Sequence, residues 1–230
     1  MTISVIIPTF NEDKILPQTL ACAATLDIGE IVVADGGSTD RTVPMAEAFC
    51  ARVPDARVIT AQRGRARQMN EGAKASRGEI LLFLHADSRL PAEAKRIILS
   101  ALADPTVVGG RFDIRFDHPS VWGTVIRTFM NWRSRLGGIA TGDQAMFVRR
   151  DVFERLGGFS DIPLMEDIEF SARLKHAGPT QALRETVTTS FRRWEQQGPL
   201  RTILLMWALR FLYWIGVSPS RLSRWYKEIR

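Results

Sequence analysis

The chain lacks the residues and motifs that identify several common classes of protein. Its 230 residues include only 2 cysteines and 3 histidines, and neither type shows the spacing of a CxxC or zinc site. Cys22 and Cys50 lie far apart in helix-like sequence, so we expect buried, reduced thiols. The motifs GxGxxG, GxxxxGKS/T and GxSxG are also absent, which argues against dinucleotide-binding, P-loop and serine-hydrolase domains.

The chain also lacks a basic leader before its first apolar segment. Residues 1–5 enter that segment directly, and we expect a cytoplasmic protein without a signal peptide. Hydrophobic residues make up 45% of the sequence and charged residues 24%, as in folded soluble domains. This composition excludes disordered, collagen-like and coiled-coil chains.

Net positive charge is confined to one end of the chain. The formal net charge is +6, and residues 192–230 alone hold eight basic and two acidic residues. The other 191 residues are neutral in sum. A nucleic-acid-binding domain would spread basic groups over its surface, so we predict no nucleic-acid partner.

The first hundred residues alternate short β-branched runs with helical segments. Strands are predicted at 3–7, 31–34, 58–60 and 80–84, and helices at 12–25, from Ser38 or Thr39 to 50, at 65–76 and from Pro91. Farther on, the pattern predicts strands at 110–116 and 144–148, a helix at 121–135 and a short helix ending at 157–159. This order predicts a mostly parallel α/β sheet that binds ligands at the carboxyl ends of its strands.

Carboxylates occur at three places where predicted strands end or helices begin. Asp35 follows the second strand, where it either accepts hydrogen bonds from a base or ribose or caps the next helix. Asp87 lies just past the apolar strand 80–84, where it either shares a divalent cation with diphosphate oxygens or caps a helix. Glu166 and Asp167 open a helix, either as a general base or only because the helix dipole favours acids there.

Basic groups lie near these acids in the sequence. Arg63, Arg65 and Arg67 alternate before a helix that carries Gln68 and Asn70. Guanidinium groups match phosphate oxygens well, although a solvated helix face explains any single one of these arginines. His85 is open to three interpretations: a ligand contact, a partner of a ligand-binding residue, or a satisfied core histidine.

Four segments, taken in order, resemble family 2 glycosyltransferases of the GT-A fold. They are Pro8-Thr9-Phe10-Asn11-Glu12, Asp35-Gly36-Gly37-Ser38-Thr39-Asp40, His85-Ala86-Asp87 and Glu166-Asp167. The match spans about residues 2–195. Details at 63–70, 82–87, 142–147 and 192–194 are similar to a bacterial subgroup assigned to arsenosugar biosynthesis.

The resemblance implies a Rossmann-like, mixed sheet flanked by helices, and an inverting transfer of sugar from a UDP- or GDP-sugar to an unknown acceptor hydroxyl. Asp167, with Glu166, matches the base, and Asp87 matches the acid that binds Mn²⁺ or Mg²⁺ in a DxD motif whose first acid is His85 here. We expect the nucleotide-sugar site to comprise Pro8, Thr9, Asn11, Glu12, Asp35, Gly36, Arg63, Arg65, Asn70, His85, Ala86 and Asp87. A polyprenyl-phosphate glycosyltransferase is the main alternative, and a sugar nucleotidyltransferase a weaker one.

The end of the chain forms a separate helical segment in this interpretation. We expect a GT-A domain over residues 1–198 and a basic, Trp-rich tail over residues 199–230. Residues 200–217 are apolar almost all round, yet Arg210 leaves no uninterrupted span of the roughly 20 residues that a bilayer crossing needs. Three roles stay open for the tail: packing or homodimerisation, peripheral contact with the inner face of the cell membrane, and acceptor binding.

Overall fold

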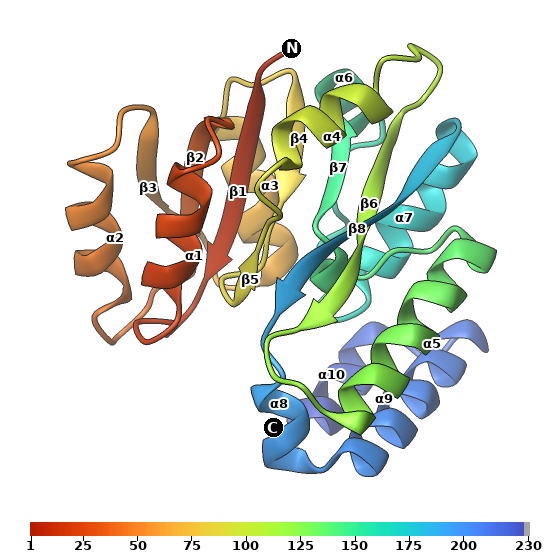
Figure 1. Ribbon diagram of the computed structural model, residues 1–230. Coiled ribbons are helices and arrows are strands. Elements are labelled where there is room, and N and C mark those ends of the chain that lie inside the picture. Colours follow the sequence, from red (N-terminus) through yellow and green to blue (C-terminus); the bar gives the residue numbers. More distant parts are fainter. Residues whose placement is uncertain (228–230) are drawn as a thin grey trace.

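The computed structural model describes residues 1–227, with the side chains of Arg193 and Lys227 left out. Residues 228–230, the end of the predicted tail, lie outside the described residues. The first half of the chain alternates strands and helices as the sequence pattern predicts (Figure 1). Its elements are β1 (Ile3–Thr9), α1 (Leu16–Ala24), β2 (Gly29–Asp35), α2 (Thr42–Cys50), β3 (Ala56–Thr60), α3 (Arg65–Ala75) and β4 (Ile80–Phe83).

The second half adds the remaining strands and most of the helices. Its elements are β5 (Ser88–Arg89), α4 (Ala94–Ala101), β6 (Gly109–Phe116), α5 (Val121–Gly137), the 3₁₀ turn η1 (Gly142–Gln144), β7 (Met146–Arg149), α6 (Arg150–Arg155), α7 (Glu166–Ala177), β8 (Thr180–Thr189), α8 (Arg192–Gln197), α9 (Pro199–Trp214) and α10 (Pro219–Lys227). Among the described residues, no helix combines the length and the apolar character that crossing a membrane requires.

All the strands join one mixed sheet in the order β3-β2-β1-β4-β7-β6-β8-β5. Strands β1 to β4 are mutually parallel where they pair, so β1, β2 and β4 end at the same edge. Strand β7 runs antiparallel to both β4 and β6, and β8 runs parallel to β6. The prediction of a mixed α/β sheet is confirmed, and the parallel edge brings three of the singled-out loops together.

The sheet is buried on both faces. Side chains alternate along β1, so that Ile3, Val5 and Ile7 pack with α1 and α4 while Ile6 packs with α3 and α6. Each of these four side chains is fully buried. This two-sided burial explains the nearly continuous apolar runs of the central strands.

Several predicted boundaries are wrong, for local reasons. Helix α1 begins at Leu16 instead of residue 12, and α4 begins at Ala94, three residues after Pro91. Helix α2 begins at Thr42, because the side chains of Ser38 and Thr39 bond to the preceding loops. Strands β5 and β8 were not predicted, since β5 has two residues and most of β8 is polar and partly exposed.

Other expectations differ in smaller ways. Cys22 and Cys50 are free thiols, but they are only partly buried. The predicted helical tail is interrupted at Gly216, where φ is +92°, so that α9 and α10 form two helices. Positive φ is a conformation that glycine adopts without strain, which explains why the chain turns there.

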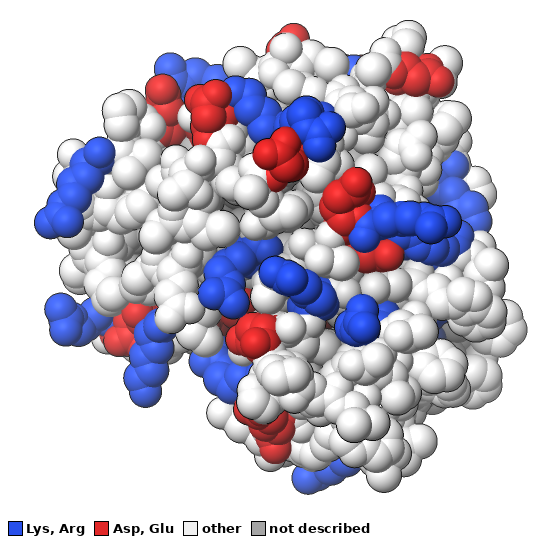
Figure 2. Space-filling view, in the orientation of Figure 1, with Lys and Arg blue, Asp and Glu red and all other residues white. Residues whose placement is uncertain are grey.

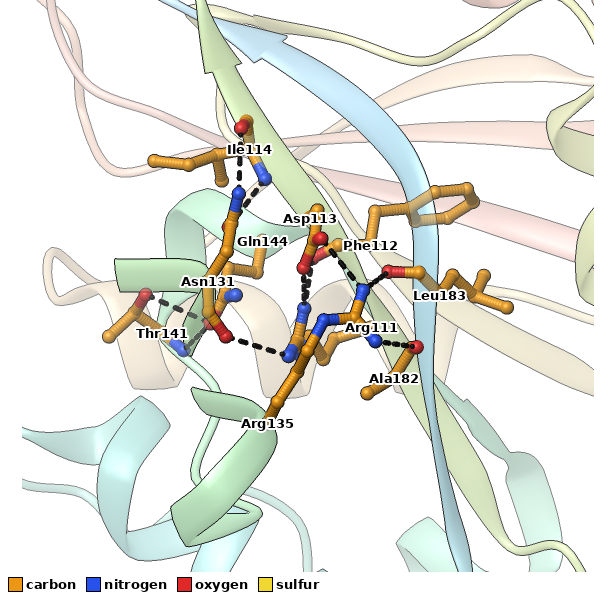
Figure 3. Close-up of polar contacts among 10 residues, drawn as sticks. All are labelled: Arg111, Phe112, Asp113, Ile114, Asn131, Arg135, Thr141, Gln144, Ala182 and Leu183. Carbon is orange, nitrogen blue, oxygen red and sulfur yellow. Dashed lines mark hydrogen bonds and ion pairs between the residues drawn. The ribbon is translucent and has the colours of Figure 1, made fainter. Parts of the chain in front are cut away.

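Helix α5 is fixed to the sheet by a polar cluster (Figure 3). Asp113 on β6 forms ion pairs with Arg111 of its own strand and with Arg135 of α5, the latter at 2.7 Å. Arg135 also donates to the main-chain oxygens of Ala182 and Leu183 on β8. These bonds orient α5 against β6 and β8, the far half of the sheet.

Candidate active site

The loops after β1 and β2 are bonded into one platform. The amide of Asn11, at φ +56°, donates to Ser38 Oγ at 2.9 Å, and Asn11 Oδ1 accepts from the Thr39 amide at 2.8 Å. The Glu12 amide donates to Thr42 Oγ1 at 2.8 Å. Two of the segments that carry the sequence resemblance therefore meet in space at the parallel edge of the sheet.

Asp35 stabilises this platform through hydrogen bonds. Its side chain is 3% exposed, and its two oxygens accept bonds from Thr9 Oγ1, Ser38 Oγ and the amides of Gly37 and Ser38. Four donors are thus bonded to one carboxylate. In this structure the carboxylate shapes its own loop, and the next helix begins only at Thr42.

Gln68 of α3 completes the platform, although it is not among the site residues expected from the sequence. Its Nε2 donates to the main-chain oxygens of Thr9 at 2.7 Å and Ala34 at 3.0 Å. A Cβ at Gly36 would lie 3.0 Å from the same nitrogen, so only glycine fits there without a shift. Nearby, the Arg63 guanidinium stacks over the Phe10 ring at 3.8 Å from its centroid.

The acid pair stands at the first turn of α7. Glu166 is 1% exposed and forms an ion pair with Arg65, with Nε to Oε1 at 2.5 Å. Asp167 accepts hydrogen bonds from the Gly142 amide at 2.7 Å and from the Ile168 amide at 2.8 Å. Burial, and next the charge of Glu166, raise the pKa of Asp167, and Arg65 only partly opposes them.

His85 lies next to the acid pair. Its Nδ1 is 3.1 Å from Asp143 Oδ1, and its Nε2 is 3.4 Å from Arg65 Nη1. Burial acts to lower the pKa of His85, but the hydrogen bond and charge of Asp143 outweigh it, so the pKa is raised. Gly142 packs so closely that a Cβ there would lie 2.3 Å from Nε2.

One hollow in the protein connects these groups. Its polar lining consists of Arg65, His85, Glu166 and Asp167, and apolar side chains from the core close its other sides. The segment after β4, the first turn of α3 and the first turn of α7 therefore meet at this hollow.

Asp87 lies beside a second hollow, between α1 and strands β5 and β8. Thr19, Asp117 and Thr189 are among the other residues that line it. The charge of Asp87 still reaches His85, where it raises the pKa. Asp87 and Asp167 line different hollows, and Asp35 lines neither of them.

The described side chains could hold a cation that also binds the substrate, but they do not form a metal site made of protein ligands alone. Among residues 1–227, no group of three or more His, Cys, Asp or Glu side chains is placed to hold a metal ion. Mg²⁺ and Mn²⁺ are commonly held by one or two carboxylates together with substrate phosphates. Asp87 fits that mode, because it can supply the single carboxylate.

The remaining expected residues lie in less direct positions. Asn70 donates to the main-chain oxygen of Phe159 and accepts from its amide, so its side chain anchors that loop. Ala86 is 5% exposed, and its oxygen accepts from Thr19 Oγ1. Pro8 pairs with Ala34 in the β1–β2 register, directly before Thr9.

Arg133 of α5 is a residue that the sequence did not point to. Its Nη2 is buried without a hydrogen-bond partner, and its charge interacts with Asp167 and Asp143. Burial lowers the pKa of Arg133 despite these acids. No motif marks this arginine, since its position depends on how α5 docks.

The tail helices α9 and α10 pack against the segment that precedes the acid pair. Leu209 of α9 and Leu222 of α10 form a buried cluster with Leu164 and Met165, the two residues before Glu166. Burial, followed by the charges of Glu169 and Asp167, raises the pKa of Tyr213 on α9. Arg192 Nη2 on α8 lies 3.6 Å from Glu12 Oε2, so α8 also contacts the loop after β1.

Comparisons with known proteins agree with this geometry. The family model described as glycosyl transferase family 2 matches residues 4–157. A probable glycosyltransferase of Bacillus subtilis is 27% identical over 201 residues, which cover 76% of this chain and 47% of that protein. A PGL/p-HBAD biosynthesis glycosyltransferase of Mycobacterium tuberculosis is 33% identical over 187 residues, or 74% of this chain and 68% of that protein.

A third relative is matched over a smaller share of its length. The undecaprenyl-phosphate 4-deoxy-4-formamido-L-arabinose transferase of Pseudomonas paraeruginosa is 33% identical over 149 residues, or 60% of this chain and 41% of that protein. The chain therefore spans less than half the length of two of these three relatives.

Solved structures share the fold. Staphylococcus aureus TarS in complex with UDP-GlcNAc has a TM-score of 0.68 at 20% identity, covering 83% of this chain and 58% of that one. A mannosyltransferase from Pyrobaculum calidifontis with GDP-Man and Mn²⁺ has a TM-score of 0.65 at 24% identity, covering 82% and 56%. The mixed sheet with its flanking helices is thus a GT-A fold.

Proposed function

This chain belongs to glycosyl transferase family 2, and on that premise we propose that it transfers a sugar from a nucleoside-diphosphate donor to an acceptor hydroxyl with inversion at the anomeric carbon. The observation that carries the proposal is the acid pair Glu166–Asp167, which faces His85 across one hollow. Both UDP- and GDP-sugars are candidate donors, since solved proteins of this fold hold UDP-GlcNAc and GDP-Man.

Asp167 is the proposed general base. It takes the proton of the acceptor hydroxyl while that oxygen attacks the anomeric carbon, and the bond from this carbon to the diphosphate oxygen breaks. The electron pair leaves with the nucleoside diphosphate. The raised pKa of Asp167 suits this role, because a stronger base removes a hydroxyl proton more readily.

Glu166 and Arg65 position and tune that base. Arg65 neutralises Glu166, which permits a second carboxylate to lie beside it. The amides of Gly142 and Ile168 hold one oxygen each of Asp167. Asp167 is therefore oriented by its own backbone and by the turn that packs on His85.

The departing diphosphate requires positive charge. Arg63 and Arg133 are the proposed contributors, because Arg63 flanks the loop platform and Arg133 has a buried nitrogen without a partner. A divalent cation held by Asp87 would neutralise further charge on the diphosphate when it is bound. His85, paired with Asp143, stands where the first acid of the DxD motif would be.

The acceptor is a separate proposal. A polyprenyl phosphate is the second candidate, because a relative with 33% identity is named for an undecaprenyl-phosphate sugar transfer. The resemblance to the arsenosugar subgroup and the location at the inner face of the cell membrane remain predictions. A sugar nucleotidyltransferase is disfavoured by the family match.

The test is the release of nucleoside diphosphate from a panel of UDP- and GDP-sugars with Mn²⁺ or Mg²⁺, with and without a polyprenyl phosphate. We expect release from one base series, and a severalfold increase with the lipid would assign the polyprenyl phosphate as the acceptor. The Asp167→Asn variant serves as the control for contaminating activity. Failure of every donor to bind in calorimetry would contradict the proposal, whereas binding without turnover would show that the acceptor is missing.

A further inference from the structure

Helix α5 exposes an apolar stripe to solvent. Its members are Val121, Val125, Phe129, Trp132 and Leu136, which are 82%, 38%, 56%, 59% and 69% exposed. They recur every three or four residues, the spacing of one helix face. The opposite side of α5 is fixed to the sheet by Arg135 and Asp113, so this stripe has no partner within the described chain.

Helix α9 exposes a second stripe of the same kind. Leu200, Leu204, Trp207, Phe211 and Trp214 are 58–81% exposed and follow in steps of four and three. The buried side of α9, with Leu209, packs on the segment before the acid pair. An apolar helix is expected to bury both of its sides, whereas the second side of α9 is exposed to solvent.

Both stripes belong to the same end of the molecule. Asp167 interacts electrostatically with Arg133 on α5 and with Tyr213 on α9, so both helices flank one carboxyl group. Figure 1 shows α5, α9 and α10 gathered at one end, below the far half of the sheet. In Figure 2 the corresponding lower-right surface is largely uncharged.

The charge of this end of the molecule indicates which kind of partner it binds. The sequences of α5, α9 and α10 contain no Asp or Glu, and Arg201, Arg221 and Arg224 on α9 and α10 are exposed. Five of the six tryptophans are exposed, and all five lie on these helices. A second copy would bring like charges together, whereas anionic lipid head groups complement them, and Trp and Arg are typical of membrane interfaces.

We propose that the outer faces of α5 and α9, together with the basic groups of α10, bind the surface of an anionic lipid bilayer. The sequence leaves such contact open as one of three roles for the tail, and α5 adds a second stripe from within the catalytic domain. The inference does not depend on the proposed reaction, because the exposed side chains proposed to contact lipid have no role in it.

The test is flotation of the full chain with vesicles of phosphatidylcholine alone and of phosphatidylcholine mixed with phosphatidylglycerol. We expect binding to the anionic vesicles only, released by high salt. The double variants Phe129→Ser/Trp132→Ser and Leu204→Ser/Trp207→Ser should each weaken binding at least about tenfold, because each removes two large apolar groups from the interface. Their circular dichroism should match the wild type.

Two pairs of charge reversals, one on the proposed lipid-binding helices and one on α3 and α4, provide a test and its matched control. Arg201→Glu/Arg221→Glu should weaken binding at least about tenfold, since each basic group near an anionic surface contributes roughly 1 kcal/mol. Lys74→Glu/Arg96→Glu changes the net charge equally on α3 and α4 and should have little effect. Equal effects of both pairs, or no binding to anionic vesicles, would overturn the proposal. A dimer that the stripe variants dissociate, without lipid binding, would assign the face to a second copy instead.

Discussion

At the scale of single residues, the site depends on one carboxyl group whose surroundings disfavour its charge. Asp167 is near the buried Glu166, and burial together with the charge of Glu166 raises its pKa despite the opposing effects of Arg65 and two backbone amides. Such a group is a better proton acceptor than a solvated aspartate. The same surroundings lower the stability of the folded protein when Asp167 is ionised.

The Asp167→Asn variant tests the catalytic role. An amide cannot accept the hydroxyl proton, so we expect turnover to fall by about 10²- to 10⁴-fold. Its oxygen can still accept from the Gly142 amide, so donor affinity measured by calorimetry should be unchanged. Turnover close to that of the wild type would refute the role of Asp167 as the base.

The same variant tests the physical origin of the raised pKa. A carboxyl group whose pKa is higher in the folded than in the unfolded state stabilises the fold at pH values below its unfolded pKa, and this contribution is lost as the pH rises through the folded pKa. At neutral pH the wild type has therefore lost it, whereas the neutral amide of the Asp167→Asn variant is not affected. We expect a Tm of the variant several degrees above that of the wild type at pH 7.

Thermal unfolding followed from pH 7 downward is the measurement for this second test. The difference in Tm should shrink as the pH falls through the raised pKa of Asp167 and vanish near pH 3, where both side chains are uncharged. A variant less stable than the wild type at pH 7 would show that the ionised carboxylate stabilises the fold.

At the scale of elements, α5 and the tail helices determine the shape of the site. Arg133 reaches the acids only because α5 is held on β6 and β8 by the Asp113 cluster. Met165, at φ +71°, turns the chain into α7 and packs against α9 and α10. The first arrangement links the far half of the sheet to the acid pair, and the second links the tail helices to it.

Replacing Asp113 tests the attachment of α5. Asp113→Ala leaves Arg111, whose side chain is 6% exposed, without its acidic partner. Removing one partner of a buried ion pair typically costs about 3–5 kcal/mol, so we expect a loss of that order in urea unfolding. The exposed pair Arg96–Glu93 on the other half is the control, and Glu93→Ala should cost less than about 1 kcal/mol. Equal losses would show that the cluster does not hold α5.

Shortening a side chain in the tail tests its link to the acid pair. Leu222 is fully buried against Leu164 and Met165, so Leu222→Ala should cost about 2–5 kcal/mol. We expect kcat to fall more than donor affinity, because the turn that holds Asp167 loosens while the platform of Asp35 is unaffected. Leu204→Ala, on the exposed side of α9, is the control. Unchanged kcat in a folded Leu222→Ala variant would separate the tail from catalysis.

The sequence predicted the parallel half of this molecule better than the rest. Central strands such as β1 and β4 are buried on both faces, so their apolar runs are visible without a structure. Asp35 and Asp87 follow strands and Asp167 opens a helix, and this order indicated a common site, although Asp87 and Asp167 line separate hollows.

What the sequence did not predict depends on tertiary contacts. Strand β8 has the sequence Thr-Gln-Ala-Leu-Arg-Glu-Thr-Val-Thr-Thr, which lacks the apolar alternation that predicts a strand. It forms a strand because it pairs with β6. Arg133 resembles any other arginine of an amphipathic helix until α5 is docked. The stripe on α5 likewise appears exposed only when the packing of its other face is known.

At the scale of the whole molecule, the proposed reaction requires the donor diphosphate to lie within reach of both the Asp87 carboxylate and the acid pair. Anomalous diffraction from Mn²⁺ in crystals grown with UDP or GDP tests this arrangement most directly. We predict a single manganese peak shared by the Asp87 carboxylate and the diphosphate, with the diphosphate on the side of the sheet edge that holds Asp167. A diphosphate bound away from Asp87, or separated from Asp167 by the sheet, would contradict the account.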